Sequence, residues 1–242
     1  MAEAAAVAAP VATPKGPGLI SRLIGVLFSP RATYAAVVAR PRALGAFVIT
    51  LGIMAVTEGA FFSTTVMQEV LMDQQVKTIE SFGVNINDQM YANLEQGIGR
   101  AAYTTPLFLV IGIPIVAAIT AAIILGIWGM LLGGVGTFKQ VYAILAHSGV
   151  ILALAVVFTM PLSYATHQLA GANLGLFVPM LEETSFLARF LGAIDLTWMW
   201  WCFNVAIGVG VLFKRKTSGV AGTFIGLYVL VALLLAIVRS GN

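Results

Sequence analysis

The sequence predicts an all-α integral membrane protein, and its composition is the first observation behind that fold class. Hydrophobic residues make up 60% of the 242 residues, and charged residues only 10%. Soluble domains contain about 45–50% apolar and about 25% charged residues, because a surface that faces water needs charge. The composition therefore disfavours a soluble enzyme, a disordered chain and a nucleic-acid-binding domain. The pI of about 9.2 reflects a net charge of only +3, so we expect no nucleic-acid partner.

Five apolar stretches, the second observation, are long enough to cross a membrane as helices. A bilayer core of about 30 Å needs roughly 20 apolar residues at 1.5 Å each. None of the stretches alternates apolar and polar residues as an outer-membrane β-strand does, so we expect helices. The predicted spans are 43–66, 107–132, 141–162, 196–213 and 219–238, which form a five-span membrane domain over residues 43–238.

The third observation is that basic residues are concentrated on one side of these spans. Nine of the 13 Lys and Arg residues precede the first span or lie in the loops after the second and fourth spans, and four lie on the other side. Seven acidic residues lie in the loops 67–101 and 163–194, on the side with fewer basic residues. Because cytoplasmic loops are enriched in Lys and Arg, we predict a cytoplasmic N-terminus and, with five spans, an external C-terminus.

Two segments precede the first span. Residues 1–18 are an Ala/Pro-rich lead without the basic and apolar regions of a signal peptide, and we expect it to be disordered and retained. Residues 19–42 are predicted to form cytoplasmic helices, the first of them amphipathic and lying at the membrane interface. Ser29 and Pro30 favour the start of a second short helix, and Pro41 favours its end.

The two external loops are predicted to contain short helices as well. The loop 67–101 is long enough for one or two, with a turn at Asn85, Asn87 and Asp88. Residues 181–193 have apolar side chains at helical spacing and are expected to form a re-entrant or surface helix. Glu182 and Glu183 would lie in its first turn, where acidic side chains interact favourably with the helix dipole.

Three polar residues inside the spans are candidate site residues. Glu58, in the first span, is either a proton or cation site facing the interior, or a carboxyl near the outer interface that is hydrogen-bonded or neutral. His147, in the third span, is either an interhelical hydrogen-bond donor or a ligand and relay. Asn204, in the fourth span, is placed to hydrogen-bond across helices.

Tryptophans lie near the predicted ends of the spans. Trp128 is close to the inner interface, and Trp198, Trp200 and Trp201 cluster near the outer end of the fourth span. Amphipathic rings favour these depths, so we interpret all four as interface anchors, with a cation-binding aromatic cage as the alternative. Asp195, directly before the fourth span, is predicted to cap that helix.

No sequence motif indicates catalysis or cofactor binding. Cys202 is the only cysteine, and His147 and His167 do not form a zinc motif. The sequence contains no phosphate-binding loop, nucleophile elbow or dinucleotide fingerprint. The segment 133–137 is expected to be a tight turn, and Pro114 is expected to kink the second span. We therefore expect a non-enzymatic protein without metal or cofactor.

Three local stretches resemble the Yip (Ypt-interacting protein) family of polytopic membrane proteins. Residues 27–34 (LFSPRATY), followed by Pro41, resemble its entry segment, and residues 133–140 (GGVGTFKQ), continuing through His147, resemble the Gly-rich turn and helix of its prokaryotic members. Residues 193–200 (AIDLTWMW) are similar to the opening of its fourth span, whereas the eukaryotic Asp-Leu-Tyr-Gly-Pro motif is absent. The resemblance covers residues 19–238 and implies the same topology, with a cytoplasmic or inner membrane location for a prokaryotic member.

The function predicted from these features is that of a scaffold or adaptor that packs against membrane partners or shapes the bilayer. It rests on the amphipathic N-terminal segment and on small residues, in 208–210 and the last span, that allow close helix approach. The expected partners are the lipid bilayer and other membrane proteins or a second copy. The alternative is a small transporter or channel subunit in which Glu58 is the intramembrane site and His147 a relay. An intramembrane enzyme is a third alternative, without a catalytic pair to support it.

Overall fold

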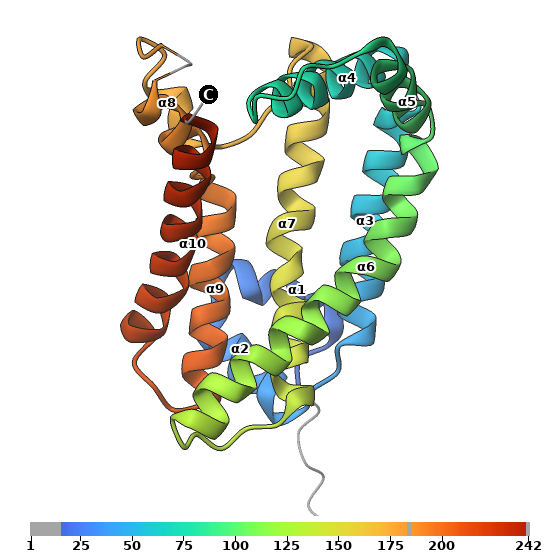
Figure 1. Cartoon of the computed structure of the whole chain (residues 1–242). Helices are drawn as coiled ribbons and strands as arrows, with labels where there is room; N and C mark the ends of the chain where they lie inside the picture. The colour runs from blue at the N-terminus through green and yellow to red at the C-terminus, as the bar shows by residue number, and fades with distance from the viewer. Residues whose placement is uncertain (1–15, 183–184, 241–242) are drawn as a thin grey trace, which may run out of the picture.

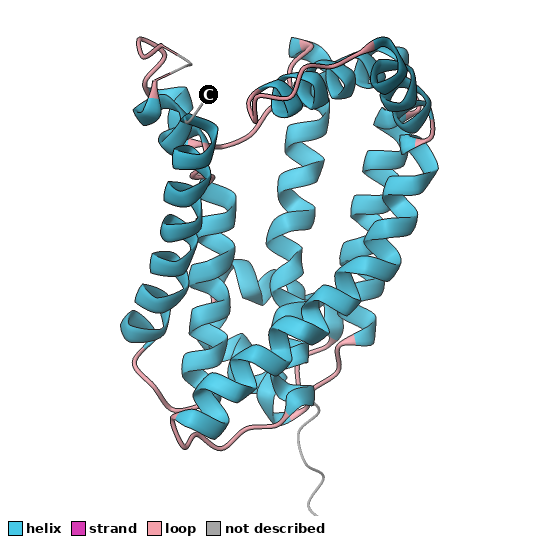
Figure 2. Ribbon diagram, in the orientation of Figure 1, coloured by secondary structure: helices cyan, strands magenta, loops and turns pink. Residues whose placement is uncertain are grey.

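The computed structural model describes residues 16–182 and 185–240, which form a bundle of helices (Figures 1 and 2). No strand element occurs within these two ranges, so the predicted all-α fold class is confirmed for them. Most of the predicted disordered lead, residues 1–15, lies outside the described residues.

Four helices are long and apolar enough to cross a membrane. They are α3 (Leu44–Phe62), α6 (Ala101–Ile124) with its continuation η1 (Leu125–Leu131), α7 (Phe138–Thr166) and α10 (Thr217–Ser240). The predicted fourth span corresponds to α9 (Leu196–Leu212), which is apolar but only 17 residues long. The structure therefore gives four candidate spans, and the helix at the predicted fourth span is shorter than they are.

The helix bounds differ from the predicted spans because polar caps and turns set them. α3 ends at Phe62, and the Thr64 hydroxyl accepts a hydrogen bond from the Met67 amide to start α4 (Thr65–Glu80). Asn87 starts α5 (Asp88–Gly99) in the same way, accepting from the Met90 amide at 2.8 Å. Of the one or two short helices predicted for this loop, the structure has two; Asn85 and Asn87 lie in the turn between them, and Asp88 is already the first residue of α5.

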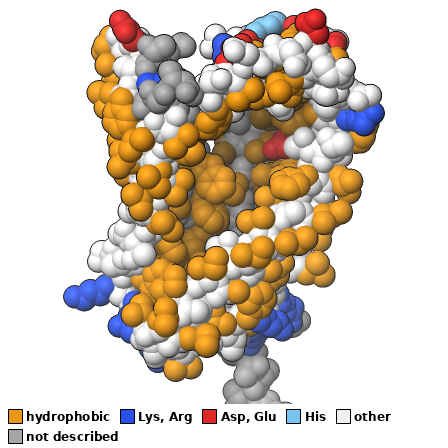
Figure 3. All heavy atoms as spheres, in the orientation of Figure 1, with side chains coloured by type: hydrophobic (Ala, Val, Ile, Leu, Met, Phe, Trp, Pro, Cys, Tyr) orange, Lys and Arg blue, Asp and Glu red, His pale blue; other side chains and the backbone are white. Residues whose placement is uncertain are grey.

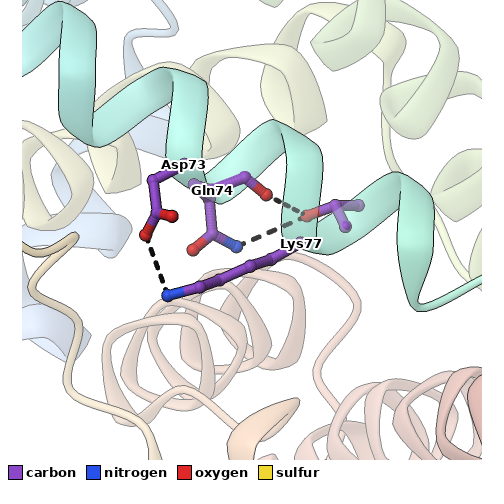
Figure 4. Close-up of polar contacts among 4 residues, drawn as sticks. Asp73, Gln74 and Lys77 are labelled. Carbon is purple, nitrogen blue, oxygen red and sulfur yellow. Dashed lines mark hydrogen bonds and ion pairs between the residues drawn. The ribbon is translucent and has the colours of Figure 1, made fainter. Parts of the chain in front are cut away.

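Residues on α4 show that its surface is polar. Asp73 and Lys77 form an ion pair of 2.8 Å one turn apart, and the Gln74 amide donates to the Thr78 hydroxyl at 3.4 Å (Figure 4). Both members of the ion pair are well exposed, and such pairs contribute about 0–1 kcal/mol. The pair therefore marks a solvated helix surface and adds little to stability.

The second long helix changes its geometry near its end. α6 stays helical through Pro106 and Pro114, and the change of helical type falls at η1, a π-helical segment. There the Leu132 amide bonds to the carbonyl of Ile127, five residues earlier, at 3.0 Å. Gly133 follows with φ of +67°, a conformation that favours glycine, and begins the expected Gly-rich turn.

α7 lies at the centre of the bundle, in contact with α1, α2, α3, α6 and α9. It begins at a capping box, in which the Thr137 hydroxyl accepts from the Gln140 amide and the Gln140 side chain accepts from the Thr137 amide at 2.9 Å. The Gln140 side-chain amide also donates to the Val38 carbonyl at 3.1 Å. The start of α7 is therefore tied to α2, far away in the sequence.

The N-terminal helices α1 (Leu19–Phe28) and α2 (Pro30–Ala39) pack into the bundle. Pro30 is the first residue of α2 as predicted, but the Ser29 side chain makes no cap; instead the Thr33 hydroxyl donates to the Ser29 carbonyl. Tyr34 and Val37 of α2 are fully buried against α7 and α9. The sequence predicted only that these helices lie at the membrane interface. The structure shows that one side of each is buried in the bundle.

One short helix corrects an electrostatic prediction. α8 (Phe186–Gly192) is capped by Ser185, whose hydroxyl accepts a hydrogen bond from the Ala188 amide at 3.2 Å. Glu182 precedes the helix, so its predicted position in the first turn is wrong, and Glu183 lies outside the described residues. The serine hydroxyl supplies the cap that the glutamates were expected to support.

Charge divides the bundle into two ends. Lys and Arg gather at the end with the start of α7, and most visible Asp and Glu lie at the opposite end, with α4, α5 and α8 (Figures 1 and 3). We call these the basic end and the acidic end. Between them the surface is largely hydrophobic, as expected of helices that contact lipid.

Candidate functional site

Asn204 of α9 joins three helices through buried hydrogen bonds. Its Oδ1 accepts from the Tyr34 hydroxyl at 2.6 Å, and its Nδ2 donates to the Val26 carbonyl at 3.1 Å. Both side chains are essentially inaccessible to water. The prediction that Asn204 bonds across helices is confirmed, and the bonds fasten α1 and α2 to α9.

Tyr34 was not singled out from the sequence, although it provides the hydroxyl of this contact. Burial raises the pKa of that hydroxyl well above its usual range, and the neighbouring Ser148 hydroxyl offsets only part of the effect. The hydroxyl therefore stays protonated and acts as a hydrogen-bond donor. A tyrosine in a short predicted surface helix carried no signal of burial, because its partner is 170 residues away in the sequence.

His147 is fully buried in α7, but its hydrogen bond lies within its own helix. Its Nδ1 is 2.8 Å from the carbonyl oxygen of Ala143, one turn earlier. The interpretation as an interhelical donor is therefore wrong, because the local carbonyl already accepts the ring hydrogen. The other nitrogen, Nε2, is buried without a hydrogen-bond partner among the residues that the structure describes.

Glu58 is partly buried in α3, one turn before the end of that helix. Its carboxylate makes no hydrogen bond or ion pair with any of the described residues. His147 lines a pocket together with Gly45, at the other end of α3. Gly45 and Glu58 are 13 residues apart, so roughly 20 Å along α3 separate Glu58 from the pocket that His147 lines. The structure does not bring Glu58 and His147 together, and Asn204 contacts neither through its hydrogen bonds.

The four tryptophans occupy different environments. Trp128 is only 5% exposed and packs against Phe224 of α10 with ring centroids 5.1 Å apart, so it is a core residue and its assignment as an anchor is corrected. Trp198 and Trp200 are exposed, and Trp198 meets Trp201 edge to face at 5.4 Å. Their role as anchors stays a prediction.

The start of α9 is fixed by two side chains. Asp195 Oδ1 accepts from the amides of Thr197 at 2.7 Å and Trp198 at 3.2 Å, which confirms the predicted cap. The Tyr228 hydroxyl of α10, not anticipated from the sequence, accepts from the Asp195 amide at 2.8 Å and donates to the Ala193 carbonyl at 3.1 Å. These contacts hold α9 beside α10.

An apolar groove opens on the side of the bundle between α6 and the pair α9–α10. Two adjoining pockets of about 120 Å³ and 290 Å³ share the lining residues Thr120, Leu145, Trp198 and Trp201. Figure 3 shows a hollow between hydrophobic walls on this face. We call it the lateral groove. Its walls are almost wholly apolar, so it can receive an apolar group at the depth of the lipid.

The described residues do not contain a group of three or more His, Cys, Asp and Glu side chains that could hold a metal ion. Cys202 is buried on the wall of the lateral groove and is a free thiol. The groups that the structure does bring together are hydrogen-bonding and apolar ones, which suit packing and binding.

The helical bundle and its long apolar helices define an integral membrane protein of the α-helical class. A family model described as the Yip1 domain matches residues 24–239, so the chain belongs to the Yip1-domain family. The family resemblance predicted from the sequence is thereby confirmed. No curated protein and no solved structure matches the chain.

Proposed function

We propose that this Yip1-domain protein is a non-enzymatic membrane adaptor that receives a transmembrane helix of a partner protein in its lateral groove. The observation that carries the proposal is the groove itself, an opening between α6 and α9–α10 lined by apolar side chains. Its volume accommodates a bulky apolar side chain, so a partner helix would insert such a side chain between the two walls.

Small residues favour a helix as the occupant. Ala117, Thr120 and Gly149 line the smaller of the two pockets, and their short side chains let another backbone approach closely. In lipid, helices associate mainly through such close packing, because the surrounding acyl chains are as apolar as the helices. The tryptophans at the groove supply large rigid contact surfaces, which are common at protein interfaces.

The adaptor would cross the membrane five times, with its basic end in the cytoplasm. α9 is short, but it is apolar, packs beside α10 and α7, and runs between the two ends of the bundle (Figure 1). The basic end would face the cytoplasm by the positive-inside rule, and the exposed Ile20, Ile24 and Phe28 of α1 would contact the inner leaflet.

Site-specific photo-crosslinking in membranes tests the proposal. A photoreactive phenylalanine analogue at Leu227, which is 59% exposed and lines the groove, is expected to crosslink to a partner protein. The matched control is Leu230, 50% exposed on the same helix but not among the lining residues. Crosslinks from Leu227 to lipid alone, or equal protein crosslinks from both positions, would contradict the adaptor function.

A further inference from the structure

A second pocket, of about 500 Å³, lies at the basic end. We call it the basic pocket. Its lining residues include the chain leading into α1, the arginines Arg22, Arg40 and Arg42, and His147. None of the lining residues is acidic. The basic pocket is therefore positively charged, unlike the lateral groove.

Arg22 is held rigidly at this pocket. It is only 7% exposed, its Nε donates to the Pro17 carbonyl at 3.0 Å, and its Nη1 donates to the Arg40 carbonyl at 3.1 Å. Neither bond uses Nη2. That atom and Arg40 Nη1 lie 4.0 Å and 3.7 Å from the point where a Cβ on Gly16 would stand, so the two guanidinium groups converge there.

The positive charge at this point is uncompensated by a carboxylate within residues 16–182 and 185–240. Burial, followed by the charges of Arg42 and then Arg40, lowers the pKa of Arg22. An arginine keeps its proton despite such effects, so the three cations repel one another. A bound anion would relieve this repulsion and satisfy the free guanidinium hydrogens.

The start of α1 adds backbone donors. Gly18 and Leu19 line the pocket, and Gly18 supplies no side-chain cap to the first turn of α1. The amides of a first helical turn have no partner within the helix and favour anions.

His147 contributes a different group. A carbonyl can only accept a hydrogen bond, so the contact to Ala143 places the ring hydrogen on Nδ1. In the neutral ring, the buried Nε2, which has no partner among the described residues, is then an acceptor. A ligand that fits the pocket presents negatively charged oxygens to the arginines and a hydroxyl to His147. A phosphate group that carries a hydroxyl, or has one beside it, matches both requirements.

We propose that the basic pocket binds a phosphate group, held by Arg22, Arg40, Arg42 and the start of α1, with a hydroxyl of the ligand donating to His147. The same chemistry is found in the headgroup of phosphatidylglycerol and in free phosphate. The site is independent of the lateral groove and of the adaptor function.

Thermal unfolding of the full chain in a neutral detergent tests the proposal in two arms. One arm adds phosphatidylglycerol, with phosphatidylcholine as the control; the other adds sodium phosphate, with sodium chloride at equal ionic strength. We expect a saturable rise of the unfolding midpoint in at least one arm, without a rise in its control. A rise with phosphatidylglycerol alone assigns a lipid headgroup, a rise with phosphate alone assigns a soluble ligand, and no rise in either overturns the site.

Two double variants locate the binding. In R40Q/R42Q, which removes two exposed arginines of the pocket, the concentration for half-maximal shift should increase at least about tenfold, because charge-assisted bonds are lost. The matched variant R31Q/K139Q removes two exposed charges at the same end, outside the pocket, and should keep the wild-type value. Equal weakening of both variants would show diffuse surface attraction and overturn the proposal.

A third variant tests the histidine. His147→Leu removes the acceptor and should weaken binding severalfold while the arginines remain. Wild-type affinity in a folded His147→Leu protein would overturn the assignment of His147. If this buried substitution does not fold, the comparison of R40Q/R42Q with R31Q/K139Q still decides the site.

Discussion

The basic end and the acidic end of the bundle are packed differently. Towards the basic end, fully buried side chains such as Tyr34, Ile144 and Val209 join α2, α7 and α9 in the largest hydrophobic cluster. Towards the acidic end, Trp198 at the start of α9 is 47% exposed on the wall of the lateral groove, which extends from there into the middle of the bundle. The protein thus fixes one end by its own packing and leaves apolar surface at the other for lipid or a partner.

The largest expected effect comes from filling space in the packed region. A Cβ on Gly208 would overlap Ile144 Cγ2 and lie 3.2 Å from Tyr34 Cδ1. Gly208→Val should therefore lower the free energy of unfolding by about 3 kcal/mol or prevent folding, because the added side chain would overlap α7 and α2 unless these helices moved away from α9. Denaturant unfolding in detergent measures the cost.

Gly222→Val is the matched control for that prediction. Gly222 is exposed on α10, and nothing lies within 4 Å of the position of an added Cβ. The change in the free energy of unfolding should stay within about 0.5 kcal/mol. Similar costs at both glycines would show that the packed region is no denser than the surface of α10.

A smaller effect on the free energy of unfolding is expected from removing side-chain hydrogen bonds, and it should differ between Asn204 and Tyr228. Asn204→Leu removes the acceptor of the Tyr34 hydroxyl and the donor to the Val26 carbonyl, both buried, and should cost about 2–3 kcal/mol. Tyr228→Phe removes a half-buried hydroxyl towards the acidic end and should cost about 1 kcal/mol. A larger loss for Tyr228→Phe, measured by the same unfolding experiment, would reverse the comparison.

The smallest effect is expected at Glu58. Glu58→Gln should leave stability within about 0.5 kcal/mol of the wild type or raise it slightly, because a neutral amide avoids the cost of a charge inside a span. Proton flux through liposomes that contain the variant should equal the wild-type flux. A flux that is present in the wild type and lost in Glu58→Gln would instead support a transporter.

Features with a local signal could be predicted from the sequence. Long apolar runs indicated α3, α6, α7 and α10, and polar residues in the right order indicated the cap at Asp195 and the turn at Asn87. Each depends on a few neighbouring residues, so periodicity and cap chemistry suffice to find it.

Features that depend on distant partners could not be predicted. Nothing local shows that Tyr34 meets Asn204, that Trp128 turns towards Phe224, or that Arg22 converges with Arg40 beside Gly16. The prediction of an interhelical hydrogen bond from His147 was wrong for another reason. The sequence could not show that the Ala143 carbonyl, in the same helix, accepts the ring hydrogen. Of the candidate site, the sequence indicated Glu58, His147 and Asn204, but neither Tyr34 nor its contact with Asn204.

The bonds of Asn204 impose an order on the assembly of the chain. Tyr34 is synthesised 170 residues before Asn204, which at 5–20 residues per second is an interval of roughly 10 to 30 s. During that time α2 has no acceptor for its buried hydroxyl and no α9 to cover Tyr34. The N-terminal helices can therefore complete these contacts only after α9 has been synthesised.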